Sequence, residues 1–294
     1  MHLIDKDVQQ VERWRDWRAQ IAGANASDRA ALLHERAQWT RRAVVTMIDQ
    51  ARAGHIGGDF SVTDVLTVLF NHVLRIDPTV PDWPQRDRFI LSKGHCAAAL
   101  YGTLAWCGFF SPDHLRTFMG PLSPLNGHPN RRKVPGVETN TGPLGHGLPV
   151  GVGAAIGARL AGGPERVFVV LGDGEMQEGS NWEALMAASH YRLDNLYITI
   201  DRNRLQQGAR TEETNGLDPL PEKLAAFGWE VREVDGHDYN ALIDAYRASE
   251  DGSPVAVIAN TTKGKGVPFI EDRVEWHHKV PSAQQVEQAL KELA

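Results

Sequence analysis

The chain has 294 residues, of which 42% are apolar and 23% are charged, and its formal net charge is −6. This apolar fraction excludes a largely disordered chain and allows a sizeable core, in one large domain or two ordinary ones. The acidic balance argues against capture by nucleic acid or by an anionic membrane surface, because both require clustered Lys and Arg.

The sequence predicts a cytoplasmic protein. Its longest apolar runs, such as Val167 to Leu171, are far too short to span a membrane, and residues 1–7 contain no apolar signal core. Cys96 and Cys107 lie eleven residues apart, without metal-ligand spacing, which favours reduced thiols.

The first eighty residues are predicted to be helical. Apolar residues recur at three- and four-residue spacing from Val11 to Ile21. A second helix is expected from Asp28 to about Ala53, with Ser27 as its N-cap. A third is expected from Ser61 to about Leu74, after a glycine-rich turn at residues 54–58.

From residue 88 onward, short apolar runs alternate with helical patterns. Residues 107–145, rich in glycine and proline, are expected to form a long functional loop. Strands are predicted at 88–91, 167–171, 196–200, 229–234 and 255–259, and helices at 96–106, 148–160, 181–191, 221–227, 239–249 and 283–293.

This alternation predicts an α/β fold with a doubly wound, mostly parallel sheet flanked by helices and preceded by an N-terminal helical extension. No composition break marks a domain boundary. Residues 1–294 are therefore expected to form a single domain, with the helices of residues 1–53 packed on it.

Polar residues follow two successive predicted strands. Gly172-Asp173-Gly174 comes directly after strand 167–171, and Asn203 lies thirty residues after Asp173. Gly-Asp-Gly alone is also a common turn. The thirty residues from Asp173 to Asn203, however, match the length of one strand–helix–strand crossover. Both side chains are therefore expected at the carboxyl ends of neighbouring parallel strands, where open α/β sheets bind ligands. Carboxylate, amide and carbonyl oxygens suit Mg²⁺ or Ca²⁺ holding a diphosphate.

This pattern resembles the thiamine diphosphate motif, and the chain is similar to the diphosphate-binding half of the transketolase family, its PP domain. Glu178-Gly179, after the Gly-Asp-Gly turn, fits as well. Four further segments carry the resemblance: Gly54-His55-Ile56-Gly57, where the family has Pro in place of Ile; residues 87–95, ending in Ser92-Lys93-Gly94-His95; Gly127-His128-Pro129; and residues 139–147, Thr-Asn-Thr-Gly-Pro-Leu-Gly-His-Gly.

The resemblance implies roles for the matched residues. The metal would be bound by the side chains of Asp173 and Asn203 and by the carbonyl oxygen of Leu205. Gly174 would donate a backbone N–H to the diphosphate, and the main chain of Gly142 and Leu144 would contact the cofactor rings. The other implied cofactor contacts are His95, Glu178, Asn203 and His277.

The resemblance also implies histidines that bind sugar hydroxyls and assist proton transfer. Histidine suits this work because its ordinary pKa lies near the operating pH. Trp276-His277-His278 offers two candidates for a fourth family histidine, of which we favour His277. His146 stands where the family commonly has Gln, and its role stays open. The substrate channel would be lined by His55, His95 and His128, and the remaining histidines are interpreted as ordinary surface or core residues: His2, His34, His72, His114, His190 and His237.

The family's chemistry also requires a glutamate that protonates the aminopyrimidine ring, and it lies in a separate pyrimidine-binding domain. Only thirty-five residues follow strand 255–259, too few for such a domain. The resemblance therefore implies the N-terminal subunit of a split transketolase, active only with a separate C-terminal subunit. The assembly would use thiamine diphosphate and Mg²⁺ (or Ca²⁺) to transfer a two-carbon ketol unit from a ketose to an aldose, phosphorylated or not.

Other interpretations stay open within the superfamily. The α subunit of a 2-oxo-acid dehydrogenase also carries Gly-Asp-Gly without a pyrimidine domain, but its decarboxylation would not require the histidines. A deoxyxylulose-phosphate synthase shares more of them but normally comes as one long chain. A non-catalytic paralogue would bind metal and diphosphate only as an interaction subunit.

Nucleotide-binding motifs fail at specific positions. Gly151-Val152-Gly153 begins like a dinucleotide fingerprint, but Ile156 occupies the third glycine position. Lys263-Gly264-Lys265-Gly266 is basic and glycine-rich but lacks the Gly-Lys-Ser/Thr of a phosphate-binding loop. It is interpreted as a loop at the end of a strand.

Overall fold

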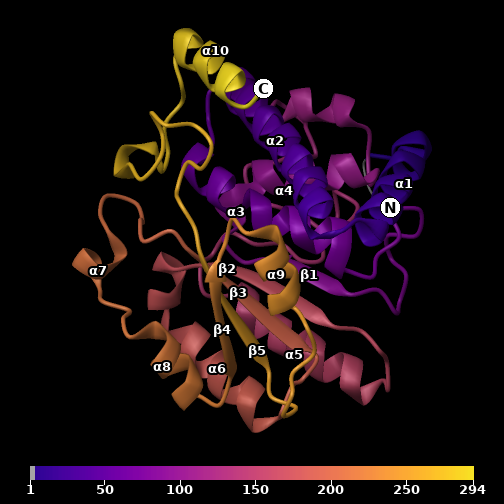
Figure 1. Ribbon diagram of the computed structural model, residues 1–294, viewed down its shortest axis with the longest axis vertical. Coiled ribbons are helices and arrows are strands. Elements are labelled where there is room, and N and C mark those ends of the chain that lie inside the picture. The colour runs from indigo at the N-terminus through magenta and orange to yellow at the C-terminus, as the bar shows by residue number, and fades with distance from the viewer. Residues whose placement is uncertain (1–3) are drawn as a thin grey trace.

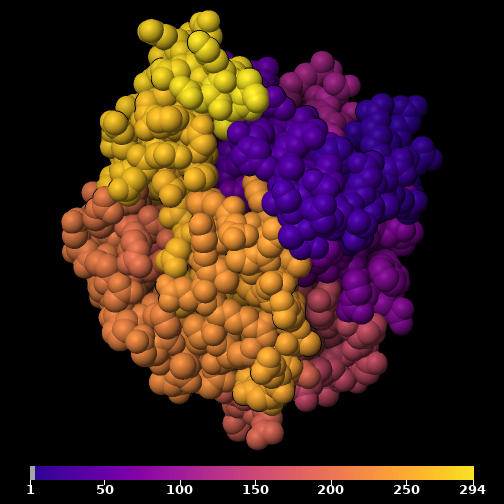
Figure 2. Space-filling model, viewed as in Figure 1, coloured from indigo at the N-terminus to yellow at the C-terminus, as the bar shows by residue number. Residues whose placement is uncertain are grey.

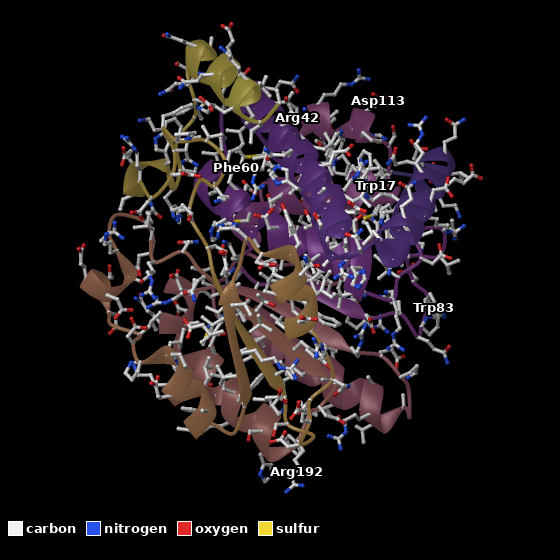
Figure 3. All side chains as sticks on the ribbon, viewed as in Figure 1. Trp17, Arg42, Phe60, Trp83, Asp113 and Arg192 are labelled. Atoms are coloured by element: carbon white, nitrogen blue, oxygen red, sulfur yellow. The ribbon has the colours of Figure 1, made fainter. Side chains whose placement is uncertain are left out.

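The computed structural model describes residues 4–294. Helices from the N-terminal part form a layer beside a parallel sheet (Figure 1). They are α1 (Val8–Gly23), α2 (Ala26–Ala51), α3 (Ile56–Val68), which continues into the π-helical turn η1 (Leu69–Val73), and α4 (Ala97–Cys107). Phe60 of α3 is fully buried in this layer (Figure 3).

The five predicted strands all form, and they build one sheet in which every neighbouring pair is parallel. The strand order is β1-β2-β3-β5-β4. The strands are β1 (Arg88–Leu91), β2 (Val167–Gly172), β3 (Leu196–Arg202), β4 (Glu230–Asp235) and β5 (Val255–Asn260).

The remaining helices connect the strands or follow the last one. They are α5 (Gly147–Leu160), α6 (Gly179–His190), α7 (Thr211–Thr214), α8 (Leu220–Ala226), α9 (Tyr239–Ala245) and α10 (Ala283–Glu292), with short 3₁₀ helices η2 (Gly94–Cys96), η3 (Pro112–Thr117), η4 (Gly174–Gln177) and η5 (Val274–Trp276).

Both faces of the sheet are buried. Alternate residues of β2 point to opposite faces, so Phe168 and Val170 join the core beneath α1–α4, whereas Val169 and Leu171 join the core beneath α5, α6 and α8. Continuous apolar strands are expected where helices cover both faces of a parallel sheet. The predicted doubly wound fold is therefore confirmed.

The C-terminal helix lies against the N-terminal helical layer. Helix α10 packs against α2, and Figure 2 shows the C-terminal segment beside the N-terminal helices. None of the helices within residues 4–294 combines the length and the apolar character needed to cross a membrane.

Two predicted helix starts are wrong. Asn25, rather than Ser27, caps α2, since its Oδ1 accepts a hydrogen bond from the Asp28 amide at 3.0 Å. Helix α3 starts at Ile56 rather than Ser61, so the predicted glycine-rich turn is largely helical. The glycines are there for close packing, because a Cβ at Gly57 would lie 2.6 Å from the Trp276 carbonyl oxygen.

Further differences concern short helices. Helix α7 was not predicted, because four residues carry no readable periodicity. Helix α9 ends at Ala245 rather than at residue 249. The guanidinium of Arg232 donates to the carbonyl oxygens of Ala245 at 2.8 Å and Arg247 at 2.7 Å. Arg232 of β4 thus supplies hydrogen-bond donors to carbonyl groups that have no partner within the helix.

Candidate functional site

Asp173 and Asn203 lie at adjacent tips of the sheet, as predicted. Asp173 directly follows β2 and Asn203 directly follows β3, and these strands pair in parallel with Gly172 opposite Asp201. Both side chains are buried. The strand–helix–strand interval in the sequence therefore correctly placed two oxygen-bearing side chains at one edge.

A cavity of about 360 Å³ opens at this edge, and it brings together every residue that the sequence singled out for the cofactor, the metal or the substrate. Its lining includes His55, His95, His128, Gly142, Leu144, Asp173, Gly174, Glu178, Asn203, Leu205 and His277. It also includes residues that were not singled out as site residues: Lys93, Gly172, Glu175, Gln177, Gln206, Gln207 and Lys263.

The Asp173 carboxylate is held in place by main-chain donors. It accepts from the Arg204 amide at 2.6 Å and the Gly174 amide at 2.8 Å, and the Arg202 guanidinium lies 3.3 Å away. Burial, together with the nearby Asp201 carboxylate, raises the pKa of Asp173 to about 6. A cation bound here would offset that burial cost.

The other two predicted metal ligands line the same cavity as Asp173. Asn203 Oδ1 accepts from the Leu205 amide at 3.1 Å, while its Nδ2 faces Ser61 and Asp201. The Leu205 carbonyl oxygen accepts from Lys263 Nζ at 3.0 Å. These hard oxygen donors fit Mg²⁺ or Ca²⁺. Gln206 Oε1, in the same cavity, is a buried acceptor without a partner in the described residues, as expected for a group that faces a ligand.

Among residues 4–294, no group of three or more His, Cys, Asp or Glu side chains is arranged to hold a metal ion. The predicted site does not depend on such a group, because it uses one carboxylate, one amide and one carbonyl oxygen. Its donor set is typical of a hard cation that also contacts phosphate oxygens rather than of zinc.

Histidine rings cluster in the same cavity. The ring centroid of His55 lies 5.0 Å from that of His95 and 5.6 Å from that of His277. His277 lines the cavity and its Nδ1 lies 2.9 Å from Lys263 Nζ. His278 is exposed, and its ring centroid lies 4.6 Å from that of His55. Because only His277 lines the cavity, the geometry favours it over His278 as the fourth site histidine.

Three of these histidines are neutral at physiological pH. Burial lowers the pKa of His55 to about 4, with the charges of neighbouring histidines and lysines adding to the effect. Burial and Lys263 lower the pKa of His277 to about 3, and burial and Lys93 keep the pKa of His95 well below its usual value. A neutral imidazole can accept one hydrogen bond and donate another, as binding to sugar hydroxyls requires.

The loop segment of residues 139–147 is fixed against the Gly-Asp-Gly turn. Glu175, fully buried after that turn, accepts from the amides of Gly145 and Gly172, each at 3.0 Å. Gly145 has a φ of +77°, and a Cβ there would lie 2.6 Å from Glu178 Cβ, so only glycine fits. His146 Nδ1 lies 3.0 Å from the Leu144 carbonyl oxygen, which gives His146 a contact with the main chain of the predicted ring-binding segment.

Sequence reasoning missed two buried lysines. Lys93 Nζ pairs with the fully buried Asp201 at 2.5 Å. Lys263 has its pKa lowered to about 8 by burial and by Lys93. Lys93 belongs to the matched segment Ser92-Lys93-Gly94-His95, in which the resemblance implies a role only for His95. Lys263 belongs to Lys263-Gly264-Lys265-Gly266, which lacks a complete phosphate-binding motif. The signal for Lys263 was a basic, glycine-rich loop directly after the last strand.

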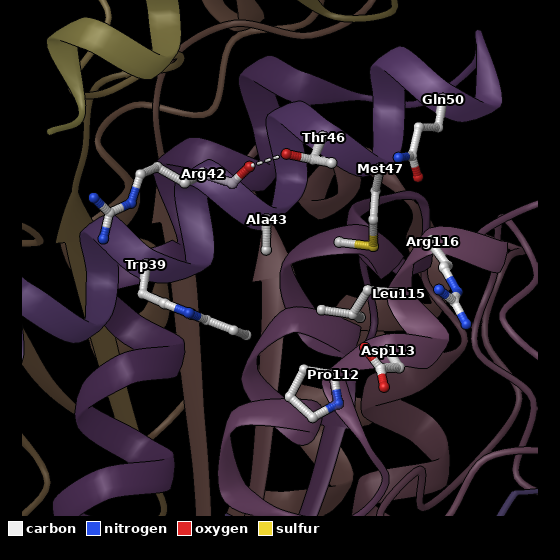
Figure 4. Close-up of a pocket in the computed structure, with 10 residues that line it drawn as sticks. All are labelled: Trp39, Arg42, Ala43, Thr46, Met47, Gln50, Pro112, Asp113, Leu115 and Arg116. Atoms are coloured by element: carbon white, nitrogen blue, oxygen red, sulfur yellow. Dashed lines mark hydrogen bonds between the residues drawn. The ribbon is translucent and has the colours of Figure 1, made fainter.

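An unrelated groove of about 460 Å³ lies between α2 and η3 (Figure 4). Apolar parts of Trp39, Met47 and Leu115 line it, and none of the predicted site residues does. The cavity at the sheet edge, which the predicted site residues line, is therefore the candidate active site.

Comparisons with known proteins agree with this geometry. Residues 33–294 match the family model described as transketolase, thiamine diphosphate binding domain. One subunit of the apulose-4-phosphate transketolase of Actinobacillus succinogenes is 48% identical over 89% of this chain and 95% of its own length. One subunit of a 6-deoxy-6-sulfo-D-fructose transketolase from a Clostridium species is 38% identical over 84% of this chain and 90% of its own length.

A solved structure of transketolase from Campylobacter jejuni is also similar, with a TM-score of 0.84 and 30% identity. The match covers 89% of this chain but 42% of that chain. The chain thus spans about two fifths of the length of the solved transketolases, but nearly the whole length of the relatives that are named as subunits. The chain belongs to the transketolase family and carries its thiamine diphosphate binding domain.

Proposed function

We propose that this chain is the cofactor-binding subunit of a two-subunit transketolase, which transfers a two-carbon ketol unit from a ketose to an aldose. One observation carries the proposal: all eleven residues assigned to cofactor, metal and substrate line a single cavity at adjacent sheet tips. The near full-length match to relatives named as transketolase subunits supports the same assignment.

In this proposal the metal is Mg²⁺ (or Ca²⁺), held by the side chains of Asp173 and Asn203 and by the Leu205 carbonyl oxygen. The Gly174 amide would donate to the diphosphate, and the main chain at Gly142 and Leu144 would contact the cofactor rings. Burial of Asp173 supports this, because its pKa stays raised in spite of the amide donors and Arg202, and a cation would offset that cost.

When bound, thiamine diphosphate supplies the carbon nucleophile and accepts the electrons of the broken carbon–carbon bond. The protein's part is to bind and orient. The rings of His55, His95, His128 and His277 would bind substrate hydroxyls and accept or donate their protons at ring nitrogens. The clustering of His55, His95 and His277 in the cavity that Asp173 and Asn203 also line supports a site in which the substrate lies beside the cofactor.

The partner in this proposal is a separate C-terminal subunit that carries the pyrimidine-binding domain and the catalytic glutamate, in a dimer of heterodimers. The relatives that the chain matches over nearly their whole length are named as transketolase subunits, which supports a second subunit. The rim of the cavity exposes Leu144 and Glu178, as expected for a site that a second subunit completes.

The substrates in this proposal are sugars with an anionic terminal group. Two similar proteins are named for apulose-4-phosphate and for 6-deoxy-6-sulfo-D-fructose, a phosphorylated and a sulfonated sugar. We also assign the assembly to the cytoplasm, because Cys96 and Cys107 are both free and buried thiols.

The test is a ketol-transfer assay with thiamine diphosphate and Mg²⁺. The purified chain alone is expected to show no transfer, and addition of the pyrimidine-domain subunit is expected to produce it, because the catalytic glutamate comes from that subunit. Full transfer by the chain alone would refute the split site. Cofactor binding without transfer in the complex would indicate a non-catalytic paralogue.

A further inference from the structure

The segment of residues 261–264 carries Lys263 into the cavity, and other parts of the chain hold its main chain at four points. Three of the hydrogen bonds join main-chain groups to main-chain groups. They run from Thr261 N to Arg202 O at 3.3 Å, from Gly264 N to Gly57 O at 2.9 Å and from Asp272 N to Lys263 O at 2.9 Å. In the fourth, the Thr262 amide donates to Nε2 of His237 at 2.8 Å.

His237 lies outside the cavity, in the turn between β4 and α9. Its Nε2 accepts from Thr262, so the proton of a neutral ring stands on Nδ1. Nδ1 lies 2.6 Å from Asp64 Oδ2 and donates to it. The ring therefore bridges a carboxylate and a loop amide in one tautomer, with both nitrogens used.

Asp64 is a fixed anchor for that bridge. It is buried on α3 and also accepts from Arg41 Nη2 of α2 at 2.6 Å and from the Tyr239 hydroxyl of α9 at 2.8 Å. Although burial alone would raise it, the Arg41 guanidinium and His237 hold the pKa of Asp64 well below its usual range. The carboxylate is thus an ionised acceptor that three helical elements keep in place.

The bridge leads to the chemistry through Lys263. That side chain is 2% exposed, donates to the Leu205 carbonyl oxygen at 3.0 Å and lies 2.9 Å from His277 Nδ1. Leu205 and His277 are both residues of the proposed site. A shift of the Thr262 main chain would therefore move Lys263, which contacts both a proposed metal ligand, Leu205, and a proposed substrate-binding residue, His277.

We propose that His237 is a positioning residue: as a neutral ring with its proton on Nδ1, it couples the buried Asp64 anchor to the Thr262 amide and so sets the place of Lys263 in the cavity. Its effect on the cofactor and on ketol transfer rests on the proposed function. Its effect on the loop does not, and the two are tested separately.

The first test follows hydrogen exchange of the Thr262 amide by NMR in the [¹⁵N]Thr-labelled chain alone. His237→Phe keeps the ring but cannot accept, so exchange at Thr262 is expected to rise about tenfold. His237→Gln, whose amide can both donate and accept, is expected to restore much of the protection. Tyr239→Phe is the matched control, because it removes a hydrogen bond to Asp64 without touching Thr262.

Unchanged exchange in His237→Phe, or an equal rise in Tyr239→Phe, would overturn the proposed bridge. A long-range ¹H–¹⁵N spectrum of the histidine-labelled chain gives an independent readout, with the proton of His237 expected on Nδ1. A proton on Nε2 would also overturn it.

The second test uses the complex with the pyrimidine-domain subunit. His237→Phe is expected to raise the thiamine diphosphate concentration for half-maximal activity about tenfold, with His237→Gln near the wild-type value. If the wild-type complex shows no transfer, the proposed function fails while the exchange test still decides the bridge. An exchange effect without any change in cofactor requirement would overturn the coupling to Lys263.

Discussion

Burial sets the protonation state of several carboxyl groups near the cavity, and Asp59 shows this most directly. It is fully buried on α3, its Oδ1 accepts from the Ala99 amide at 2.8 Å, and its Oδ2 has no partner in the described residues. Burial raises the pKa of Asp59 to about 7, against the opposing effects of Ala99 and Lys93. The folded chain therefore holds this proton over a pH range in which the unfolded chain has lost it.

This predicts a pH dependence of stability with a definite sign. Because the folded pKa of Asp59 is raised, the contribution of Asp59 to the free energy of unfolding falls as pH rises from about 4 to about 7 and is then constant. Relative to Asp59→Asn, which cannot ionise, the wild-type chain is expected to lose up to about 4 kcal/mol over that range. Urea denaturation at several pH values measures the difference.

Asp113→Asn is the matched control, because Asp113 is exposed on η3 and away from the core. It is expected to leave the pH dependence of the wild-type chain unchanged. Parallel pH profiles for the wild-type chain and Asp59→Asn would contradict the raised pKa of Asp59.

At the scale of elements, the amino end of α3 is fixed by contact rather than by propensity. A Cβ at Gly57 would meet the Trp276 carbonyl oxygen at 2.6 Å, and one at Gly58 would meet Cys96 Sγ at 2.9 Å. Sequence patterns read this glycine-rich segment as a turn because glycine is a poor helix former. Glycine stands at these helical positions because a larger side chain would not fit between α3 and its neighbours η5 and η2.

Two glycine substitutions test this explanation. Gly57→Ala is expected to lower the free energy of unfolding by about 2 kcal/mol, since overpacking against backbone outweighs the gain in helix propensity. Gly157→Ala, in the exposed face of α5 with nothing within 4 Å of the new Cβ, is expected to raise it by about 0.5–1 kcal/mol. Thermal or urea unfolding measures both. Equal stabilisation by the two substitutions would show that the contact at Gly57 does not matter.

What the sequence predicts well at this scale depends on continuous patterns. The central strands β2, β3 and β5 could be predicted because strands buried on both faces are nearly uninterrupted apolar runs, as in Val167 to Leu171. The edge strand β4 carries a mixed pattern instead, with Val231 and Val234 among charged residues. The positions of Asp173 and Asn203 followed from strand order alone. The start of α3 and the end of α9 were not readable, since contacts with Trp276 and Arg232, distant in sequence, decide them.

At the scale of the whole molecule, one buried apolar core extends from Ile4 to Leu293 and includes residues of α2, the sheet and α10. This supports our proposal that residues 1–294 form a single domain with the N-terminal helices packed on it. It also explains why the contacts of His237 could not be predicted from the sequence. They depend on how α2, α3, α9 and the last loop meet, which no local pattern records.

In the proposed function, Asp173 helps to hold a metal–diphosphate group at the tips of β2 and β3. Calorimetric titration of thiamine diphosphate into the complex with its pyrimidine-domain partner, with and without Mg²⁺, tests it directly. Binding is expected to require Mg²⁺ and to weaken about 100-fold or more in Asp173→Asn, with Asp113→Asn unaffected. Wild-type affinity in Asp173→Asn, or binding that does not depend on Mg²⁺, would contradict the account.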